Sequence, residues 1–240
     1  MAGGLPDPRS GIAARRPLLP DGGGLRGGAG GGRHPAPCDA AVFLAPESAG
    51  AGARRGPDGA GAVKHCIFFD RDGTLIEERN YLSDPDQVVL IPGAAEAVRL
   101  ARGAGYLAVV LTNQSGVGRG YFTLEDVERV NARMGELLGR EGARIDGIYV
   151  CPHAPEDGCD CRKPRTGLVE RAVRELGIDV GASWVVGDKA TDLELARNAG
   201  MRGVLVGTGY GSEAAAPPSG GDGLTAADVL QAVRRIVGER

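Results

Sequence analysis

Two aspartates, Asp70 and Asp72, follow a short apolar run at residues 67–69 and stand directly before Gly73-Thr74. The run predicts a buried strand that leaves its sheet at Asp70. In open parallel α/β sheets, ligands bind at the carboxyl ends of the strands. There, one carboxylate can attack phosphorus while the other handles the proton of the leaving group. Two solvated turn acids are the alternative, but the attached Gly-Thr and the motifs downstream favour chemistry.

A second predicted strand, at 107–112, ends in a polar segment that continues to residue 116. Thr112 offers a hydroxyl and Asn113 an amide, and small residues follow. Such groups at a strand end can hold phosphate oxygens through side chains and backbone N–H groups. Thr-Asn alone is often only a turn or a helix N-cap. Its position one crossover beyond Asp70 favours phosphate binding.

Three thiols and one imidazole lie within eleven residues after a third predicted strand, at 145–150. They are Cys151, His153, Cys159 and Cys161. This set predicts a tetrahedral zinc site. Disulfides are the alternative, and an odd number of thiols in a chain expected to be cytoplasmic argues against them. Because the protein would fill all four positions, we expect the zinc to be structural.

A basic pair, Arg162-Lys163, comes directly after the last of these cysteines. Pro164 disfavours a helix at Lys163, so we expect the pair to be extended. An ammonium there can neutralise charge on phosphate and on the attacking carboxylate, and a guanidinium can add a bidentate contact. A solvated basic pair is the alternative, and the neighbouring zinc site makes it the weaker one.

A third carboxylate, Asp188, ends a fourth predicted strand at 183–187. Mg²⁺ takes oxygen ligands, usually one or two carboxylates with water and phosphate. Asp70, the backbone carbonyl of Asp72 and Asp188 would meet that need. Asp192, four residues on, is either a second support of the site or an acid at a helix start.

Strands and helices alternate downstream of residue 63. Strands are predicted at 65–70, 107–112, 145–150, 183–187 and 203–206, and helices at 94–104, 124–138, 167–176, 190–199 and 226–237. This alternation predicts right-handed crossovers and a parallel sheet that is covered on both faces.

Local signals set some helix boundaries. Thr123 and Asp126 predict a capping box. The inward face of that helix is predicted to be Val127, Val130, Met134 and Leu137. Gly177 and Gly200 stand where helix C-caps are expected.

Bulk properties limit the class of protein. The 240 residues carry a net charge of −3 with both signs mixed, which predicts no nucleic-acid partner. No apolar run approaches the length of a membrane span, so we expect no membrane partner and a cytoplasmic location. Residues 63–240 are predicted to form one α/β domain. Residues 1–62, rich in Gly, Ala, Pro and Arg, are predicted to be a disordered tail, with a targeting peptide or an over-long start as open alternatives.

The motifs from Asp70 to Asp188 resemble, in order, those of haloacid dehalogenase (HAD) superfamily phosphatases. With the cysteine cluster before Arg162, residues 65–210 resemble the D-glycero-D-manno-heptose 1,7-bisphosphate 7-phosphatase family. Further points of likeness are Tyr81 and the segments 91–93, 112–116, 118–120 and 187–189. Histidinol-phosphate phosphatases are close relatives, in which an acid tends to replace Ser115. Ser115 and the segment 118–120 therefore favour the heptose family.

The resemblance implies a three-layer Rossmann-like (HAD-like) fold with a small zinc loop and no large cap. It implies an Mg²⁺-dependent phosphatase that removes the C7 phosphate through an aspartyl-phosphate, in nucleotide-activated heptose (lipopolysaccharide precursor) biosynthesis. The implied catalytic residues are Asp70 and Asp72, the transition-state stabilisers Thr112 and Lys163, and the Mg²⁺ ligands Asp70, Asp72 and Asp188. The implied substrate contacts are Arg79, Asn80, Tyr81, Thr112, Asn113, Gln114, Ser115, Arg162, Lys163 and Lys189.

The expected partner is a small phosphosugar, and the expected state is a monomer. A histidinol-phosphate phosphatase of histidine biosynthesis is the first alternative. A non-catalytic phosphosugar-binding module is a remote one, because both Asp70 and Asp72 are present.

Overall fold

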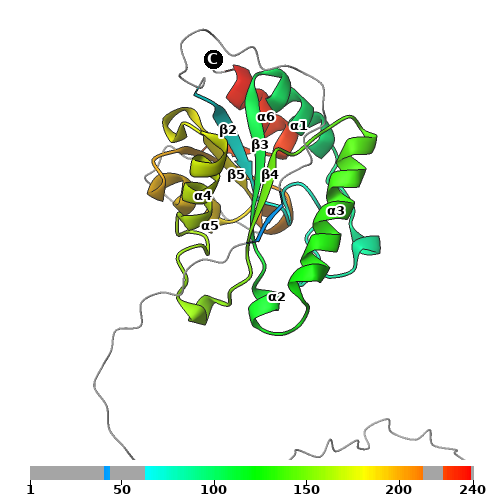
Figure 1. Cartoon of the computed structure of the whole chain (residues 1–240). Coiled ribbons are helices and arrows are strands. Elements are labelled where there is room, and N and C mark those ends of the chain that lie inside the picture. Colours follow the sequence, from blue (N-terminus) through cyan, green and yellow to red (C-terminus); the bar gives the residue numbers. More distant parts are fainter. Residues whose placement is uncertain (1–40, 44–62, 213–223, 239–240) are drawn as a thin grey trace, which may run out of the picture. The chain divides into compact units, whose positions relative to one another are not determined.

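The computed structural model describes residues 41–43, 63–212 and 224–238. Its centre is a seven-stranded sheet in the order β1-β4-β3-β2-β5-β6-β7 (Figure 1). Every neighbouring pair is parallel except β1 with β4. The strands are β1 (Ala41–Phe43), β2 (His65–Phe69), β3 (Tyr106–Asn113), β4 (Gly147–Cys151), β5 (Trp184–Gly187), β6 (Arg202–Val206) and β7 (Leu224–Ala226).

The five predicted strands are confirmed, with ends that shift by a few residues. The edge strands β1 and β7 were not predicted. Each has three residues, which is too short to show a period in sequence. β1 lies within 1–62, so the prediction of disorder does not hold for Ala41–Phe43; the rest of 1–62 lies outside the described residues.

The helices are α1 (Ala94–Gly103), α2 (Ser115–Gly118), α3 (Leu124–Arg140), α4 (Gly167–Leu176), α5 (Ala190–Asn198) and α6 (Val229–Gly238). The predicted helix at 226–237 begins only at Val229, because Leu224–Ala226 pair with β6. Short 3₁₀ turns lie at Pro85–Gln87 (η1), Pro155–Asp157 (η2), Val180–Ala182 (η3) and Gly209–Ser212 (η4).

The capping box of α3 is confirmed. The Asp126 N–H donates to Thr123 Oγ1 at 3.2 Å, and the Thr123 N–H donates to Asp126 Oδ2 at 2.7 Å. On the inward face, Leu137 is partly buried and packs against the core as predicted, whereas the fully buried Leu138 was not predicted. Leu138 is four residues beyond Met134 and continues the buried row on that face.

Helices cover both faces of the sheet, as Figure 1 shows. Alternate residues of β2 point to opposite faces, so Ile67 and Phe69 pack with α1, α3 and α6, while Phe68 packs with α4 and α5. Side chains on both faces of β2 are fully buried. The confirmed three-layer arrangement therefore places β2 in the middle of the sheet, between the two layers of helices.

Chain order creates a switch point beside β2. The chain runs from β2 outward through β3 to β4, then returns to form β5 on the other side of β2. Phe69 pairs with Val110 of β3 and with Val186 of β5, so the residues that follow these strands emerge at one edge. A crevice outside the carboxyl ends of such strands is where ligands bind in open α/β sheets.

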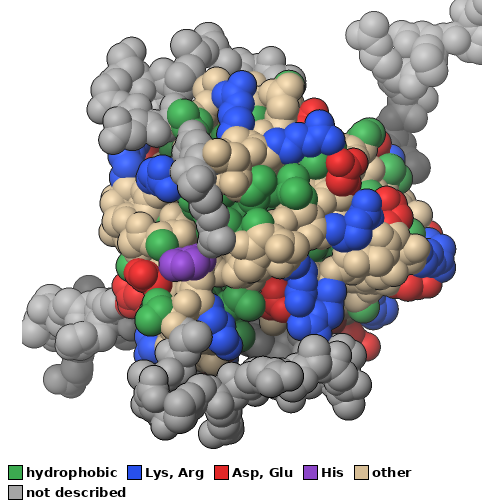
Figure 2. Space-filling model, turned by 90° about the horizontal axis from the view of Figure 1, so that it is seen from above, with side chains coloured by type: hydrophobic (Ala, Val, Ile, Leu, Met, Phe, Trp, Pro, Cys, Tyr) green, Lys and Arg blue, Asp and Glu red, His purple; other side chains and the backbone are tan. Residues whose placement is uncertain are grey.

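Charged side chains of both signs occur together on the surface. On the face that Figure 2 shows, Lys and Arg side chains lie beside Asp and Glu side chains, with hydrophobic ones between them. Among the described helices, none is long and apolar enough to cross a membrane.

Candidate active site and metal centres

A pocket of ≈ 510 Å³ opens at the carboxyl edge of β2, β3 and β5. Predicted site residues that line it are Asp70, Asp72, Asn80, Tyr81, Thr112, Asn113, Gln114, Ser115, Arg162, Lys163 and Lys189. Residues 112–115 come from the end of β3 and the start of α2, and Arg162 and Lys163 come from the loop before α4. The fold thus gathers residues that are more than ninety positions apart in sequence.

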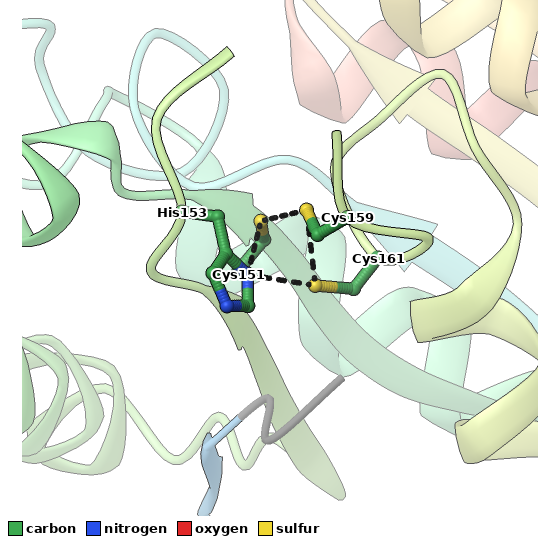
Figure 3. A group of neighbouring side chains, drawn as sticks. All are labelled: Cys151, His153, Cys159 and Cys161. Carbon is green, nitrogen blue, oxygen red and sulfur yellow. Dashed lines mark hydrogen bonds between the residues drawn. The ribbon is translucent and has the colours of Figure 1, made fainter. Parts of the chain in front are cut away.

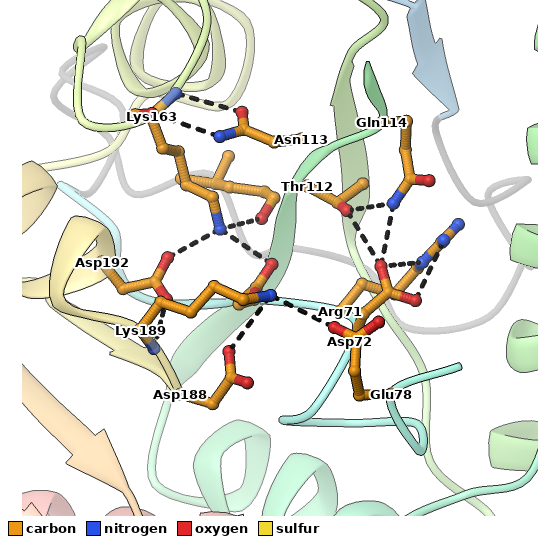
Figure 4. A network of polar contacts seen from close by, with 12 residues as sticks. Arg71, Asp72, Glu78, Thr112, Asn113, Gln114, Lys163, Asp188, Lys189 and Asp192 are labelled. Carbon is orange, nitrogen blue, oxygen red and sulfur yellow. Dashed lines mark hydrogen bonds and ion pairs between the residues drawn. The ribbon is translucent and has the colours of Figure 1, made fainter. Parts of the chain in front are cut away.

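Lys163 lies at the bottom of this pocket and uses all three of its ammonium donors (Figure 4). Its Nζ donates to Asp70 Oδ1 at 2.8 Å, to Asp192 Oδ1 at 2.7 Å and to the Leu111 carbonyl at 2.9 Å. Burial alone would lower the pKa of Lys163, but the charges of Asp192 and Asp70 outweigh burial and raise the pKa. Lys163 therefore stays a cation beside Asp70.

The carboxyl group of Asp70 is buried, which by itself raises its pKa. The charges of Lys163 and Lys189 outweigh this and hold the pKa of Asp70 below its usual value. An ionised carboxylate at the bottom of a pocket is available as a nucleophile.

Asp188 supplies a carboxylate next to Asp70. Its Oδ2 accepts from the Tyr210 N–H at 2.9 Å. Its buried Oδ1 has no hydrogen-bond partner among the described residues and lies 3.8 Å from Lys189 Nζ. Burial and the charge of Asp70 raise the pKa of Asp188 to about 7, against the opposing charge of Lys189.

Carboxylate oxygens of Asp70, Asp188 and Asp192 all lie within 4.8 Å of one another. Buried carboxylates with one unpartnered oxygen match the hard oxygen ligands that Mg²⁺ prefers. Gly73 and Gly209 leave room for this group, since a Cβ on either would come within 2.3 Å of Asp188 Oδ2. The donor set therefore fits a magnesium ion.

Asp192 has both of the roles that its sequence position left open. Its Oδ1 accepts from Lys163, and its Oδ2 accepts from the Lys189 N–H at 3.1 Å, at the start of α5. The four-residue spacing from Asp188 was the signal that left both roles open, but Asp192 was not among the predicted catalytic, metal or substrate residues.

Asp72 is held by donors on both of its oxygens. Arg71 donates from Nε to Oδ2 at 3.0 Å and from Nη2 to Oδ1 at 3.1 Å. Gln114 Nε2 donates to Asp72 Oδ2 at 2.8 Å, and also to Thr112 Oγ1 at 2.8 Å. Gln114 was predicted as a substrate contact; here it links Asp72 to Thr112.

Asn113, also predicted as a substrate contact, holds the backbone of Lys163. Its Nδ2 donates to the Lys163 carbonyl at 3.2 Å, and its Oδ1 accepts from the Lys163 N–H at 3.1 Å. The pair of bonds ties the end of β3 to the segment after the cysteine cluster. Asn113 therefore positions Lys163.

The loop after Asp72 forms one wall of the pocket. Tyr81 has a positive φ of 62° and packs edge-on against Tyr121, with ring centroids 4.9 Å apart. Arg79 does not join this wall: its guanidinium pairs with Glu77 at 2.8 Å in an exposed position. No signal in the sequence showed that Tyr81 would line the pocket and that Arg79 would not.

Two of the lining residues that were not predicted, Glu78 and Tyr210, contact Lys189. Glu78 accepts from Lys189 Nζ at 3.2 Å, and the same ammonium lies 4.5 Å from the ring centroid of Tyr210. Burial raises the pKa of Glu78. Both residues therefore help to place the Lys189 ammonium at the pocket.

The predicted cysteine cluster is assembled at the end of β4 (Figure 3). Cys151 Sγ lies 3.7 Å from Cys159 Sγ and 3.7 Å from His153 Nδ1, and Cys161 Sγ lies 3.6 Å from Cys159 Sγ and 3.3 Å from His153 Nδ1. A tetrahedral zinc with bonds of about 2.3 Å separates its sulfur ligands by about 3.8 Å.

The thiol chemistry agrees with that geometry. None of the three cysteines forms a disulfide within the described part of the chain. A hydrogen bond from Cys161 lowers the pKa of Cys151 to about 5, against the effect of burial, whereas burial raises the pKa of Cys159. Because the thiolate is the form that binds metal, the cluster fits a zinc ion with four protein ligands.

Comparisons with known proteins agree with this site. A family model described as HAD-hydrolase-like matches residues 160–232. The D-glycero-beta-D-manno-heptose-1,7-bisphosphate 7-phosphatase of Pseudomonas aeruginosa is 40% identical over 149 residues, which are 62% of this chain and 84% of the relative. The D-glycero-D-manno-heptose-1,7-bisphosphate 7-phosphatase of Thermosynechococcus vestitus is 42% identical over 157 residues, 61% of this chain and 80% of the relative.

Among solved structures, the D,D-heptose 1,7-bisphosphate phosphatase from B. bronchiseptica, crystallised with magnesium and phosphate, matches with a TM-score of 0.67. It is 31% identical, over 73% of this chain and 99% of that structure. None of these three relatives carries a histidinol-phosphate name, so the comparison does not favour that alternative. The chain covers most of each relative at this identity, and it therefore belongs to the family of D-glycero-D-manno-heptose-1,7-bisphosphate 7-phosphatases, which are phosphatases of the HAD hydrolase type.

Proposed function

We propose that the protein removes the C7 phosphate from D-glycero-D-manno-heptose 1,7-bisphosphate. The observation that carries this proposal is the buried Asp70 carboxylate in the pocket, whose Oδ1 lies 2.8 Å from Lys163 Nζ and which has an oxygen within 4.8 Å of a carboxylate oxygen of Asp188. The names of the matching relatives supply the substrate.

In the proposed reaction, a carboxylate oxygen of Asp70 attacks phosphorus and forms an aspartyl-phosphate. The bond from phosphorus to the sugar oxygen breaks, and Asp72 gives that oxygen a proton. Water then attacks phosphorus and passes a proton to Asp72, while the bond to Asp70 breaks and releases inorganic phosphate.

Lys163 and Thr112 stabilise negative charge on the transferring group by position and electrostatics. Asp70, Asp188 and the backbone carbonyl of Asp72 would hold Mg²⁺, which when bound supplies further positive charge to the phosphoryl oxygens. Asn80, Tyr81, Ser115, Arg162 and Lys189 line the pocket and are the proposed sugar and phosphate contacts. Arg79 lies outside the lining and is left out of this set.

Zinc at the cysteine cluster would be structural. The cluster ends one residue before Arg162, whose Nη1 donates to the His153 carbonyl at 3.3 Å. A metal that joins Cys151 to Cys161 would thus fix the segment that carries Arg162 and Lys163. Thiols without disulfides in this cluster support a proposed cytoplasmic location. The proposed substrate supports a role in nucleotide-activated heptose biosynthesis. The monomeric state stays a prediction for size-exclusion measurement.

The test is phosphate release by the full chain with Mg²⁺, with heptose 1,7-bisphosphate (both anomers) and histidinol phosphate as parallel substrates. We expect a higher kcat/KM for the heptose and loss of one phosphate per molecule. A preference for histidinol phosphate would overturn the substrate, and phosphate release from neither would overturn the phosphatase proposal.

A further inference from the structure

Arg71, which lies between the two catalytic aspartates, has a fully buried side chain. Its backbone is fixed, because the Arg71 carbonyl accepts from the N–H groups of Leu75 at 2.9 Å and Ile76 at 3.1 Å. Its guanidinium makes the two-pronged contact with Asp72 described above. A planar fork of this kind sets the plane of a carboxylate, which a lysine could not do.

The remaining nitrogen of the Arg71 guanidinium, Nη1, contacts helix α3. Nη1 donates to Asn131 Oδ1 at 2.9 Å, and Asn131 lies in α3, 60 positions further along the chain. Asn131 is 2% exposed, and its Nδ2 has no partner among the described residues. The amide is therefore used for Arg71 alone.

The neutral amide suits this task. Arg71 has one positive charge, and among its hydrogen-bond partners in the described part of the chain Asp72 is the one carboxylate. A second carboxylate at position 131 would compete with Asp72 for the guanidinium. An amide orients the guanidinium without adding charge. An isolated aspartate side chain has several staggered rotamers, and a proton transfer needs one geometry.

We propose that Arg71 and Asn131 are positioning residues for the acid–base step. They hold the Asp72 carboxyl in the orientation from which it exchanges protons with the sugar oxygen and with water. The inference rests on the proposed role of Asp72, and it links the packing of α3 to the reaction.

A comparison of two substrates with different leaving groups tests this proposal. A sugar oxygen needs a proton as it departs, whereas p-nitrophenolate leaves as a stable anion. Because kcat/KM reports the first phosphoryl transfer, a misplaced Asp72 lowers it for the sugar substrate and spares it for p-nitrophenyl phosphate. A structural defect lowers both.

We expect Asn131→Leu to lower kcat/KM for heptose 1,7-bisphosphate by roughly tenfold to a hundredfold, and to change it less than about threefold for p-nitrophenyl phosphate. Arg71→Lys, which keeps the charge and loses the fork, should show the same selectivity. Met134→Leu is the matched control, because Met134 lies on the same buried face of α3 and should leave both values unchanged.

Equal losses on both substrates, or no loss with Asn131→Leu and Arg71→Lys, would overturn the proposal. If the wild type acts on histidinol phosphate and not on the heptose, the proposed substrate fails. The same comparison is then made with histidinol phosphate, whose leaving oxygen also needs a proton, and it decides the role of Arg71 separately.

Discussion

Lys163 and Asp70 form a buried ion pair, 2.8 Å from Nζ to Oδ1, between segments 93 positions apart. Lys163 also serves Asp192, so one ammonium faces two carboxylates, and Asp188 adds a third. The Lys189 ammonium lies near Asp188 and also pairs with Glu78. The bottom of the pocket thus has more negative than positive groups, an imbalance that a divalent cation would offset.

Removal of the Lys163 charge is expected to destabilise the fold. Lys163→Met leaves Asp70 and Asp192 buried without their cation, and breaking a buried pair in this way costs about 3–5 kcal/mol of the free energy of unfolding. Urea denaturation without added Mg²⁺ measures it. The control is Arg234→Met, which breaks the exposed pair with Glu96 and should shift the midpoint very little. Equal midpoints for the two variants would show that the buried network contributes no stability.

Loss of the nucleophile is expected to abolish turnover while the fold remains. In Asp70→Asn, Lys163 keeps its bonds to Asp192 and to the Leu111 carbonyl, so the network stays largely paired. We expect kcat to fall by roughly 10⁴-fold or more. Phosphate release and circular dichroism on the same preparation check both parts. Residual turnover within tenfold of wild type would mean that Asp70 is not the nucleophile.

The positions of the chemical groups could be predicted because they follow strands. Each central strand ends at the same edge of a parallel sheet, so Asp70, Thr112 and Asp188 were placed correctly without knowledge of any helix packing. The close spacing of Cys151 and Cys161 likewise restricts those thiols to one loop.

Contacts that depend on helix packing could not be predicted. The bond from Arg71 to Asn131 depends on how α3 lies against the sheet, and the bond from Lys189 to Glu78 depends on the path of an irregular loop. The exposed position of Arg79, paired with Glu77 rather than lining the pocket, depends on the path of the same loop. Short edge strands such as β7 lack a readable period.

Zinc is expected to be bound at about one ion per chain. Cys159→Ser should lower zinc affinity by more than the roughly 10- to 100-fold typical of changes around the ligands, since one of the four ligands is lost. It should also lower kcat, because the segment of Arg162 and Lys163 loosens. Metal analysis after dialysis measures the first effect. Cys66→Ala is the control: Cys66 is a buried thiol outside the cluster, and its variant should keep the metal. A wild-type protein without zinc would contradict the prediction.

Substitution of Gly209, the glycine that packs against Asp188, is expected to raise the magnesium requirement of the enzyme. Gly209 has a φ of +56°, and a Cβ there would lie 2.3 Å from Asp188 Oδ2 and 2.6 Å from the Gly73 Cα, which is backbone and cannot rotate away. Gly209→Ala must therefore displace the Asp188 carboxylate. The Mg²⁺ concentration for half-maximal activity should rise by roughly 10- to 100-fold.

Gly200→Ala separates this clash from backbone strain. Gly200 has a φ of +71°, and a Cβ there would meet no atom within 4 Å, so the variant carries the strain of a left-handed residue without touching Asp188. That strain costs roughly 1–2 kcal/mol in either variant. We expect both to lose thermal stability, and Gly209→Ala alone to need more Mg²⁺. The same Mg²⁺ requirement in both variants would mean that Asp188 is not held in place by the close approach of Gly209.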